Sequence, residues 1–211
     1  MRLTSSAADS DGFLRELHHR VKNNFQIIAS LINLQKRLLP ADRRGEARFV
    51  EEHVQSMAAA YRIVTVSDGT VQVSLGDLVS DVVDTLRQIA ELNRGSIELT
   101  LPPTPRFIRI DQAVAMGLYL AVVVPPYLDA AAGLGAVVRV GIEMEDPERA
   151  TLSIATAKEA TIVTDPLRRR LTAAYLRQLF AEVEPGSDPG ATRVQIRLQS
   201  LQAARPVGQS A

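Results

Sequence analysis

Two adjacent histidines, His18 and His19, are the residues of this sequence best suited to chemistry. They are two of the three histidines in the chain and lie in the segment ELHHRVKNNFQII, residues 16–28. A neutral imidazole can bind a metal, move a proton or attack an electrophile such as phosphorus. Neighbouring residues of a helix are rotated by about 100° from each other, so the two rings face different ways. We therefore expect them to have different roles.

On a helix through residues 13–38, His19 would be the exposed member of the pair. His18 lies four residues after Leu14 and three before Val21, at the border of an apolar stripe, whereas His19 lies on the far side. The residues one turn from His19 are polar, namely Arg15, Lys22 and Asn23. Cations beside an exposed imidazole would stabilise the negative charge of a bound phosphoryl group.

The same residues also fit an ordinary solvated helix surface, where most charged-face histidines belong. Metal binding by two helical histidines needs i and i+4 spacing, whereas these two are adjacent, so no metal site is predicted. A Ser-His-Asp arrangement would need a nucleophile motif that the sequence lacks. The solvated surface and the phosphoryl acceptor both remain open on the residues alone.

The spacing of apolar residues predicts a helical hairpin over residues 11–68. The first helix has apolar positions three and four residues apart for about seven turns and ends before Pro40. These positions are Leu14, Leu17, Val21, Phe25, Ile28, Leu31, Ile32 and Leu38. A second helix, marked by Val50, Val54, Met57, Tyr61 and Val64, is expected to end near VSDGT. One hairpin cannot cover both apolar faces, so we expect a homodimer joined as a four-helix bundle.

Residues 70–202 predict a mixture of helices and strands. Expected strands are VQV (71–73), SIELTL (96–101), RFIRI (106–110), VVRVGIEME (137–145), ATLSIATA (150–157) and ATRVQIRLQ (191–199). Expected helices are Leu75–Asn93, one that Asp111 caps, and Leu167–Phe180. Helices combined with antiparallel hairpins indicate an α+β sandwich. Residues 1–10 and 203–211 are expected to be flexible ends.

Composition narrows the class of protein. The 211 residues carry 24 basic and 24 acidic side chains, and this balance argues against a nucleic-acid binder with a broad basic face. The sequence has no cysteine, which excludes disulfides and thiolate chemistry. The apolar stretch 113–128 is shorter than a membrane span and contains two prolines, and the first residues lack the apolar run of a secretory signal. We expect a cytoplasmic protein without a membrane partner.

The segment ELHHRVKNNFQIIASLINLQ (residues 16–35) closely resembles the phosphoacceptor helix of one bacterial histidine kinase family. This is the His-Arg-Val-Lys-Asn (HisKA_2 or HWE-like) subfamily, in which the histidine directly before the arginine is phosphorylated. The resemblance implies that His19 is the phosphoacceptor and that Arg20, Lys22 and Asn23 belong to its site. It also implies that His18 is a packing or orienting neighbour.

The resemblance continues into the second region, which follows the order of the family's ATP-binding domain. There the family has a Glu-x-x-x-Asn pair that assists proton transfer and holds Mg²⁺, whereas the alignment places Val122 and Pro126 at these positions. Neither side chain can ligate a metal or move a proton. The family's Asp-x-Gly-x-Gly is replaced by TAKEA at residues 156–160, and no Gly-x-Gly opens the next helix. Gly133-Leu134-Gly135 is interpreted as a turn rather than a phosphate cradle.

The sequence therefore predicts a histidine phosphotransferase on a degenerate kinase fold, which exchanges a phosphoryl group with response-regulator receiver domains. The chain itself would bind no cofactor, because the receiver supplies Mg²⁺. A hybrid histidine kinase is a candidate partner. The alternatives are an active kinase with an unorthodox nucleotide site and a non-catalytic receiver-binding adaptor. Four residues, Tyr119, Pro125, Pro126 and Tyr127, are interpreted either as a second contact surface or as core packing around a helix kink.

Overall fold

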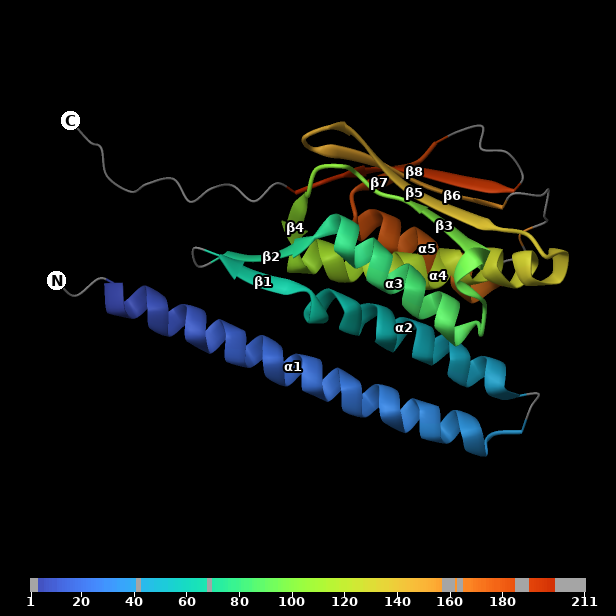
Figure 1. Cartoon of the computed structure of the whole chain (residues 1–211), viewed down its shortest axis with the longest axis horizontal. Helices are drawn as coiled ribbons and strands as arrows, with labels where there is room; N and C mark the ends of the chain where they lie inside the picture. Colours follow the sequence, from blue (N-terminus) through green and yellow to red (C-terminus); the bar gives the residue numbers. More distant parts are fainter. Residues whose placement is uncertain are drawn as a thin grey trace.

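The computed structural model describes residues 4–40, 43–67, 70–156, 162, 165–184 and 190–199. The side chains of residues 4–11, 13–15, 18 and 67 lie outside this description. The chain forms a long helical hairpin, followed by a layer of three helices and a sheet that covers them (Figure 1). The predicted α+β class, with a helical hairpin before an α/β region, is confirmed.

Helix α1 (Thr4–Leu38) is longer at its start than the sequence analysis predicted. The sequence analysis placed the start near residue 11, after a flexible segment of ten residues. Ala7 and Ala8 are strong helix formers, and no proline or glycine interrupts the chain before Gly12, so the helix extends back to Thr4. Its end at Leu38, two residues before Pro40, agrees with the prediction.

The second helix is shorter than predicted. Helix α2 (Arg44–Arg62) ends before Val64, and β1 (Val64–Ser67) then pairs antiparallel with β2 (Thr70–Ser74). The apolar spacing that we assigned to the helix continues into the β-branched run Val64-Thr65-Val66, which favours an extended backbone. Strand β4 (Phe107–Arg109) completes this three-stranded sheet. The end of the predicted hairpin segment therefore belongs to a sheet of the second region.

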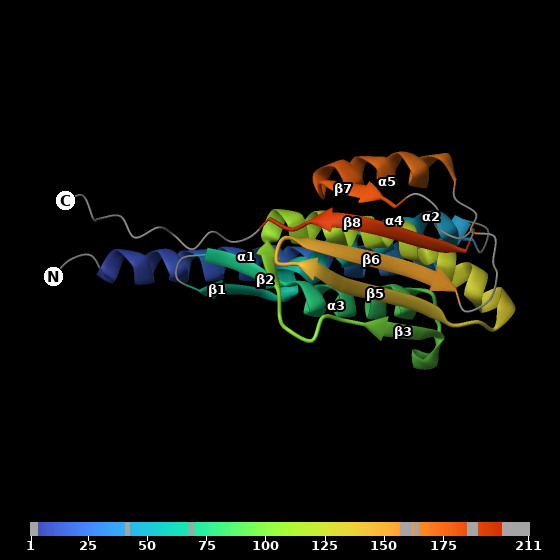
Figure 2. The same cartoon turned by 90° about the horizontal axis from the view of Figure 1, so that it is seen from above.

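The second region has two layers. Five strands, in the order β3-β5-β6-β8-β7, cover helices α3, α4 and α5 (Figure 2). The strands are β3 (Ile97–Thr100), β5 (Val138–Asp146), β6 (Arg149–Thr156), β7 (Ala181–Val183) and β8 (Ala191–Arg197). The predicted hairpin of β5 and β6 is confirmed, and their register places Val140 opposite Ile154. Both residues belong to the apolar core between sheet and helices.

Helices α3 (Leu75–Ile89), α4 (Ile110–Leu134) and α5 (Pro166–Gln178) form the middle layer. Helix α3 ends four residues earlier than predicted, and a short 3-10 helix, η2 (Arg94–Ser96), leads into β3. Asp111 lies in the first turn of α4, whose N-cap is Arg109, rather than at the cap position. Helix α5 ends before Phe180, whose backbone has a positive φ of 50°, and the short strand β7 was not predicted.

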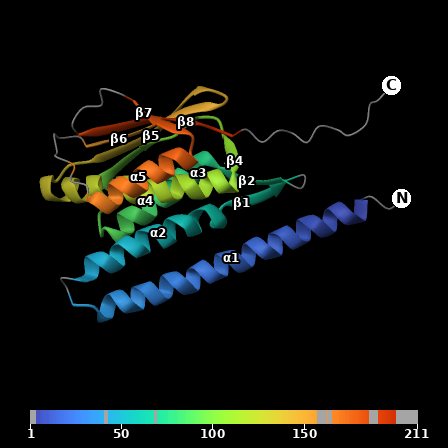
Figure 3. The same cartoon turned by 180° about the vertical axis from the view of Figure 1, so that it is seen from behind.

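Helix α2 lies between α1 and the three-helix layer, as the views from the front and from behind agree (Figures 1 and 3). At the crossing of α2 and α4, a Cβ atom on Gly117 would lie only 2.7 Å from the carbonyl oxygen of Ser56. This face of α2 is rich in alanine, with Ala58, Ala59 and Ala60 buried. Small side chains let the two helix backbones approach closely, so one face of the hairpin is packed onto the second region.

Helix α4 is the central element of the core. Its length and apolar composition would suffice to cross a membrane, but 72% of its most apolar window is buried inside the protein. Tyr119 and Leu120 are fully buried on it. The helix continues through Pro125 and Pro126, which lie in its interior.

Candidate functional site

His19 is exposed on α1, as the helical spacing predicted. Its Nδ1 lies 3.3 Å from the side-chain nitrogen of Asn23, one turn further along. An asparagine amide carries both a donor and an acceptor, so it can hold either neutral tautomer of the ring. In the contact as it stands, the amide N–H of Asn23 donates to Nδ1, which leaves the ring proton on Nε2. Rotating the amide by 180° lets its oxygen accept from Nδ1–H, and the lone pair of Nε2 is then available for attack.

Arg20 pairs with a residue of its own helix rather than with His19 or Asn23. Its Nε donates to Glu16 Oε1 at 2.7 Å, and both side chains are exposed. The hydrogen bond and the charge of Arg20 lower the pKa of the Glu16 carboxyl. Glu16 was not assigned a role from the sequence, although its i, i+4 spacing to Arg20 is the signal of such a pair.

Lys22 lies one turn from His19 and is half-buried. It has no hydrogen bond or ion pair to any residue that the structure describes, so its ammonium group is available to a partner's anion. The side chains of Arg15 and His18 lie outside the described residues. The proposed roles of these two residues therefore remain predictions.

An apolar stripe of large side chains runs along the part of α1 that α2 leaves uncovered. Six of these side chains are between 43% and 78% exposed: Leu17, Ile27, Ile28, Leu31, Leu34 and Leu38. Phe25 and Ala29 instead face α2, where Phe25 packs on Tyr61 with ring centroids 5.4 Å apart. The predicted single seam is thus divided into a covered face and an exposed one. We call the six exposed residues the α1 stripe.

The two positions aligned with the family's Glu and Asn lie inside α4. Val122 is 1% exposed and Pro126 is buried. Neither residue presents an oxygen side chain, and both are covered by neighbouring elements. Of the segment aligned with the Asp-x-Gly-x-Gly motif, residues 156–160, only Thr156 lies within the described residues.

Two further sequence interpretations are settled by burial and backbone geometry. Tyr119 and Tyr127 are at most 4% exposed, and Pro125 and Pro126 are buried as well, so the interpretation as a contact surface is wrong and core packing holds. Gly135 has a φ of 57° and caps the end of α4, since its N–H donates to the carbonyl of Ala131. Glycine adopts this left-handed conformation without strain, so the Gly133–Gly135 segment is a helix end, as interpreted.

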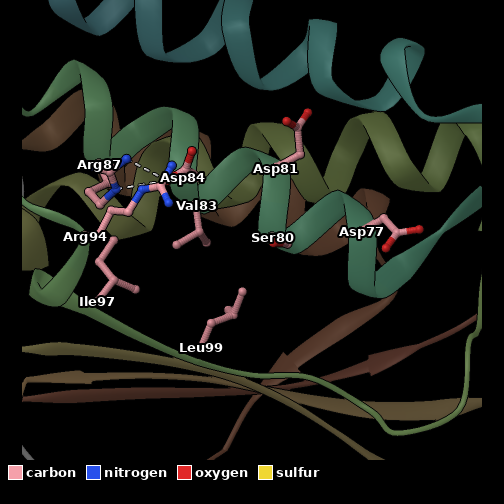
Figure 4. Close-up of a pocket in the computed structure, with 9 residues that line it drawn as sticks. All are labelled: Asp77, Ser80, Asp81, Val83, Asp84, Arg87, Arg94, Ile97 and Leu99. Carbon is pink, nitrogen blue, oxygen red and sulfur yellow. Dashed lines mark hydrogen bonds and ion pairs between the residues drawn. The ribbon is translucent and has the colours of Figure 1, made fainter.

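A cavity of about 510 Å³ opens between α3 and β3 (Figure 4). Its wall on α3 includes Asp81 and Asp84, and Ile97 and Leu99 of β3 line the opposite side. Asp81 pairs with Arg62 at 2.7 Å, and Asp84 pairs with Arg87 at the same distance. These carboxylates are already compensated within the chain, and we assign no ligand to the cavity.

Sequence reasoning also missed a set of buried ionic residues on α2. Glu51 and Glu52 are 5% and 1% exposed, and Arg168 of α5 reaches Glu52 at 3.2 Å. Adjacent glutamates in a helix whose other buried residues are mostly alanine could have indicated that one carboxylate faces inward. Their packing depends on tertiary contacts that no local pattern contains.

The chain thus combines an exposed histidine on a helical hairpin with a helix-and-sheet region that follows it. The family model for histidine kinases of the HisKA_2 type matches residues 16–90, which contain the whole segment around His19. The sensor histidine kinase PdtaS of Mycobacterium tuberculosis is 31% identical over 86 residues, 40% of this chain and 17% of that protein. The PdtaS of Mycolicibacterium smegmatis is 31% identical over 84 residues.

The fold agrees with this match over a longer span. The histidine kinase domain of the blue-light activated kinase EL346 from Erythrobacter litoralis superposes with a TM-score of 0.60. The superposition covers 92% of this chain and 94% of that domain at 19% identity. Residues 16–90 thus belong to the HisKA_2 histidine kinase family, as the motif around His19 predicted. The chain spans about 17% of the length of the curated relatives that it matches.

Proposed function

We propose that this protein is a histidine phosphotransferase of a two-component phosphorelay, which carries a phosphoryl group on His19 and takes none from ATP. The observation that supports this most is a contrast within the chain. The family's acceptor histidine is present and exposed beside Asn23, whereas buried Val122 and Pro126 stand where the family holds Mg²⁺ and moves a proton. Phosphoryl transfer from ATP needs bound metal and several charge-stabilising contacts together.

The proposed reaction needs only a presented nucleophile from this chain. Nε2 of neutral His19 attacks the phosphorus of an aspartyl phosphate on a receiver domain. The acyl phosphate P–O bond breaks, the aspartate leaves as a carboxylate, and a P–N bond forms. The reverse reaction on a second receiver completes the relay. Asn23 orients the ring, and Lys22 and Arg15 would meet the receiver's acidic, Mg²⁺-containing pocket.

Three expectations belong to this function. Receiver domains are the partners, with a hybrid kinase as a candidate source of the phosphoryl group. The α1 stripe pairs with its copy in a homodimer, which would remove six large apolar side chains from water. The protein acts in the cytoplasm, where response regulators are found.

The test compares histidine variants with two phosphoryl donors. A receiver domain labelled on its aspartate should transfer acid-labile, base-stable label to the wild type and to His18→Ala, but not to His19→Ala. Lys22→Ala should slow the transfer, and added salt should reduce the difference because it screens the lysine charge. Label on His18 rather than His19 would contradict the assignment.

A second candidate, an active kinase, is favoured by one observation: the relatives matched over residues 16–90 are sensor kinases. Incubation with labelled Mg-ATP separates the two functions. Phosphotransfer without kinase activity predicts no label from ATP and full label from the receiver. Label on His19 from ATP alone would establish the kinase, and binding of a receiver without any label would establish an adaptor.

A further inference from the structure

Two adjacent prolines in the buried helix α4 leave two backbone carbonyls without their usual hydrogen-bond donors. Proline has no backbone N–H, so Pro125 and Pro126 cannot donate to the carbonyls four residues earlier, which are those of Ala121 and Val122. Both of these residues are buried, at 0% and 1% exposure. A buried carbonyl without a donor is destabilising, so a partner from elsewhere is expected.

Arg168 of α5 is that partner. Its Nη1 lies 3.1 Å from the Val122 carbonyl and 3.4 Å from the Ala121 carbonyl. One guanidinium group thus replaces both hydrogen bonds that the proline pair removes. The start of α5 holds the arginine in place, because Asp165 caps the helix by accepting from the Arg168 N–H at 2.9 Å.

The charge of Arg168 is compensated by Asp165, whose Oδ2 lies 3.4 Å from its Nε, and by the hairpin. Its Nη2 donates to Glu52 Oε2 of α2 at 3.2 Å, and its guanidinium lies 5.0 Å from the centre of the Phe49 ring. Arg48 donates to the other oxygen of Glu52 at 2.9 Å and forms an ion pair with Asp129 of α4 at the same distance. Burial raises the pKa of the Glu52 carboxyl, and the two arginines oppose that rise.

The neighbouring Glu51 points the other way along the hairpin. Its Oε2 accepts from Lys36 Nζ of α1 at 2.9 Å. Two consecutive buried carboxylates on α2 therefore connect α1 on one side with α4 and α5 on the other. A buried charge left without its partner is strongly destabilising, so each of these carboxylates needs its cation in place.

We propose that Arg168 and Glu52 form a clasp that fixes the phosphoacceptor hairpin on the second region, with the proline pair of α4 as its anchor. The clasp makes hairpin and second region one rigid body, so that His19 keeps a fixed position relative to the sheet. This proposal concerns how the hairpin is held on the second region, and it does not depend on whether His19 carries a phosphoryl group.

The first experiment measures amide hydrogen exchange in the full-length chain. Arg168→Met keeps an unbranched chain but removes every contact of the guanidinium. Exchange in residues 48–60 of α2 and 121–130 of α4 should accelerate at least tenfold, with α3 unchanged. Arg169→Met is the matched control, since Arg169 is exposed on the same helix. Equal acceleration in the control, or none in Arg168→Met, would overturn the clasp.

A second measurement reports the position of the hairpin directly. The chain has no cysteine, so spin labels attach only to cysteines introduced at exposed Ser30 of α1 and exposed Glu143 of β5. Dilution with unlabelled protein leaves only the distance within one chain. The wild-type distribution should be narrow, and Arg168→Met should broaden it.

Glu52→Gln provides a variant that preserves side-chain shape and the arginine contacts to α4. It should broaden the same distribution, and this result stands even where Arg168→Met fails to fold. A distribution as narrow as that of the wild type in folded Glu52→Gln and Arg168→Met would show that packing alone holds the hairpin, which overturns the proposal.

Discussion

The contact between α2 and α4 permits one substitution whose cost can be worked out from the structure. Gly117 lies in the interior of α4, where a Cβ atom would be 2.7 Å from the Ser56 carbonyl oxygen and 3.3 Å from the carbonyl carbon. Both of these atoms are backbone, so no side-chain rotation can relieve the clash. Ordinary contact begins near 3.4 Å, and Gly117→Ala therefore requires the helices to separate by about 0.7 Å.

A shift of that size between two packed helices resembles overpacking of a core, which costs about 1–3 kcal/mol. Alanine also favours the helix over glycine by about 1 kcal/mol, which partly hides the cost. Near the end of the same helix, a Cβ atom on Gly133 would meet no atom of the described residues within 4 Å, so Gly133→Ala gains the helix preference alone. The difference in the free energy of unfolding between the two variants should thus be about 1–3 kcal/mol.

Urea unfolding of both variants, followed by circular dichroism, measures this difference. At about 2–4 °C per kcal/mol for a chain of this size, thermal midpoints should also fall for Gly117→Ala and not for Gly133→Ala. Hydrogen exchange in α2 should accelerate only in Gly117→Ala. Equal stability of the two variants would refute the close approach of α2 and α4, and with it the packing of the hairpin onto the second region.

Three further predictions follow from burial, charge and exposure. Tyr127→Phe removes the 2.6 Å hydrogen bond to Thr192 and should lower the free energy of unfolding by about 0.5–1.5 kcal/mol. Tyr119→Phe is the control and should be neutral or stabilising, because that buried hydroxyl has no partner among the described residues. Replacing Ile28 and Leu31 by glutamate should convert dimers into monomers in analytical ultracentrifugation, and a wild type that sediments as a monomer at tens of micromolar would contradict the bundle. Burial lowers the pKa of His53, so the unfolded chain binds its proton first as the pH falls; thermal stability should drop between pH 7.5 and 5.5 by more in the wild type than in His53→Leu.

Local signals in the sequence were sufficient for most of the elements and for the exposed histidine. The 3.6-residue spacing placed α1 and the outward face of His19, and alternating residues placed β5, β6 and β8. The helical spacing led to a wrong assignment at Val64. The apolar residues that mark α2 recur every three or four positions, and Val64 continues that spacing although it is the first residue of a strand. Only the pairing of β1 with β2 decides between the two.

The buried ionic contacts could not have been predicted in the same way. Arg168, Arg169 and Arg170 are identical neighbours in the sequence, yet only the first turns inward. Arg168 turns inward because it meets two backbone carbonyls of α4 that the prolines leave without a donor, and a carboxylate of α2. The carbonyls lie more than forty residues away in the sequence. Such a choice depends on how three helices meet, and no window of the sequence contains all three.

The prolines and the arginine also bear on the position that the sequence alignment pairs with the family's metal-holding asparagine. Pro126 has no amide side chain, and it removes a backbone hydrogen bond from a buried helix. Arg168 restores hydrogen bonding to the Val122 carbonyl, and Glu52 balances its charge. Pro126→Asn would therefore introduce an amide side chain while leaving the arginine and its carboxylate in place beside it. These contacts lie among α2, α4 and α5, and among the described residues His19 takes no part in them.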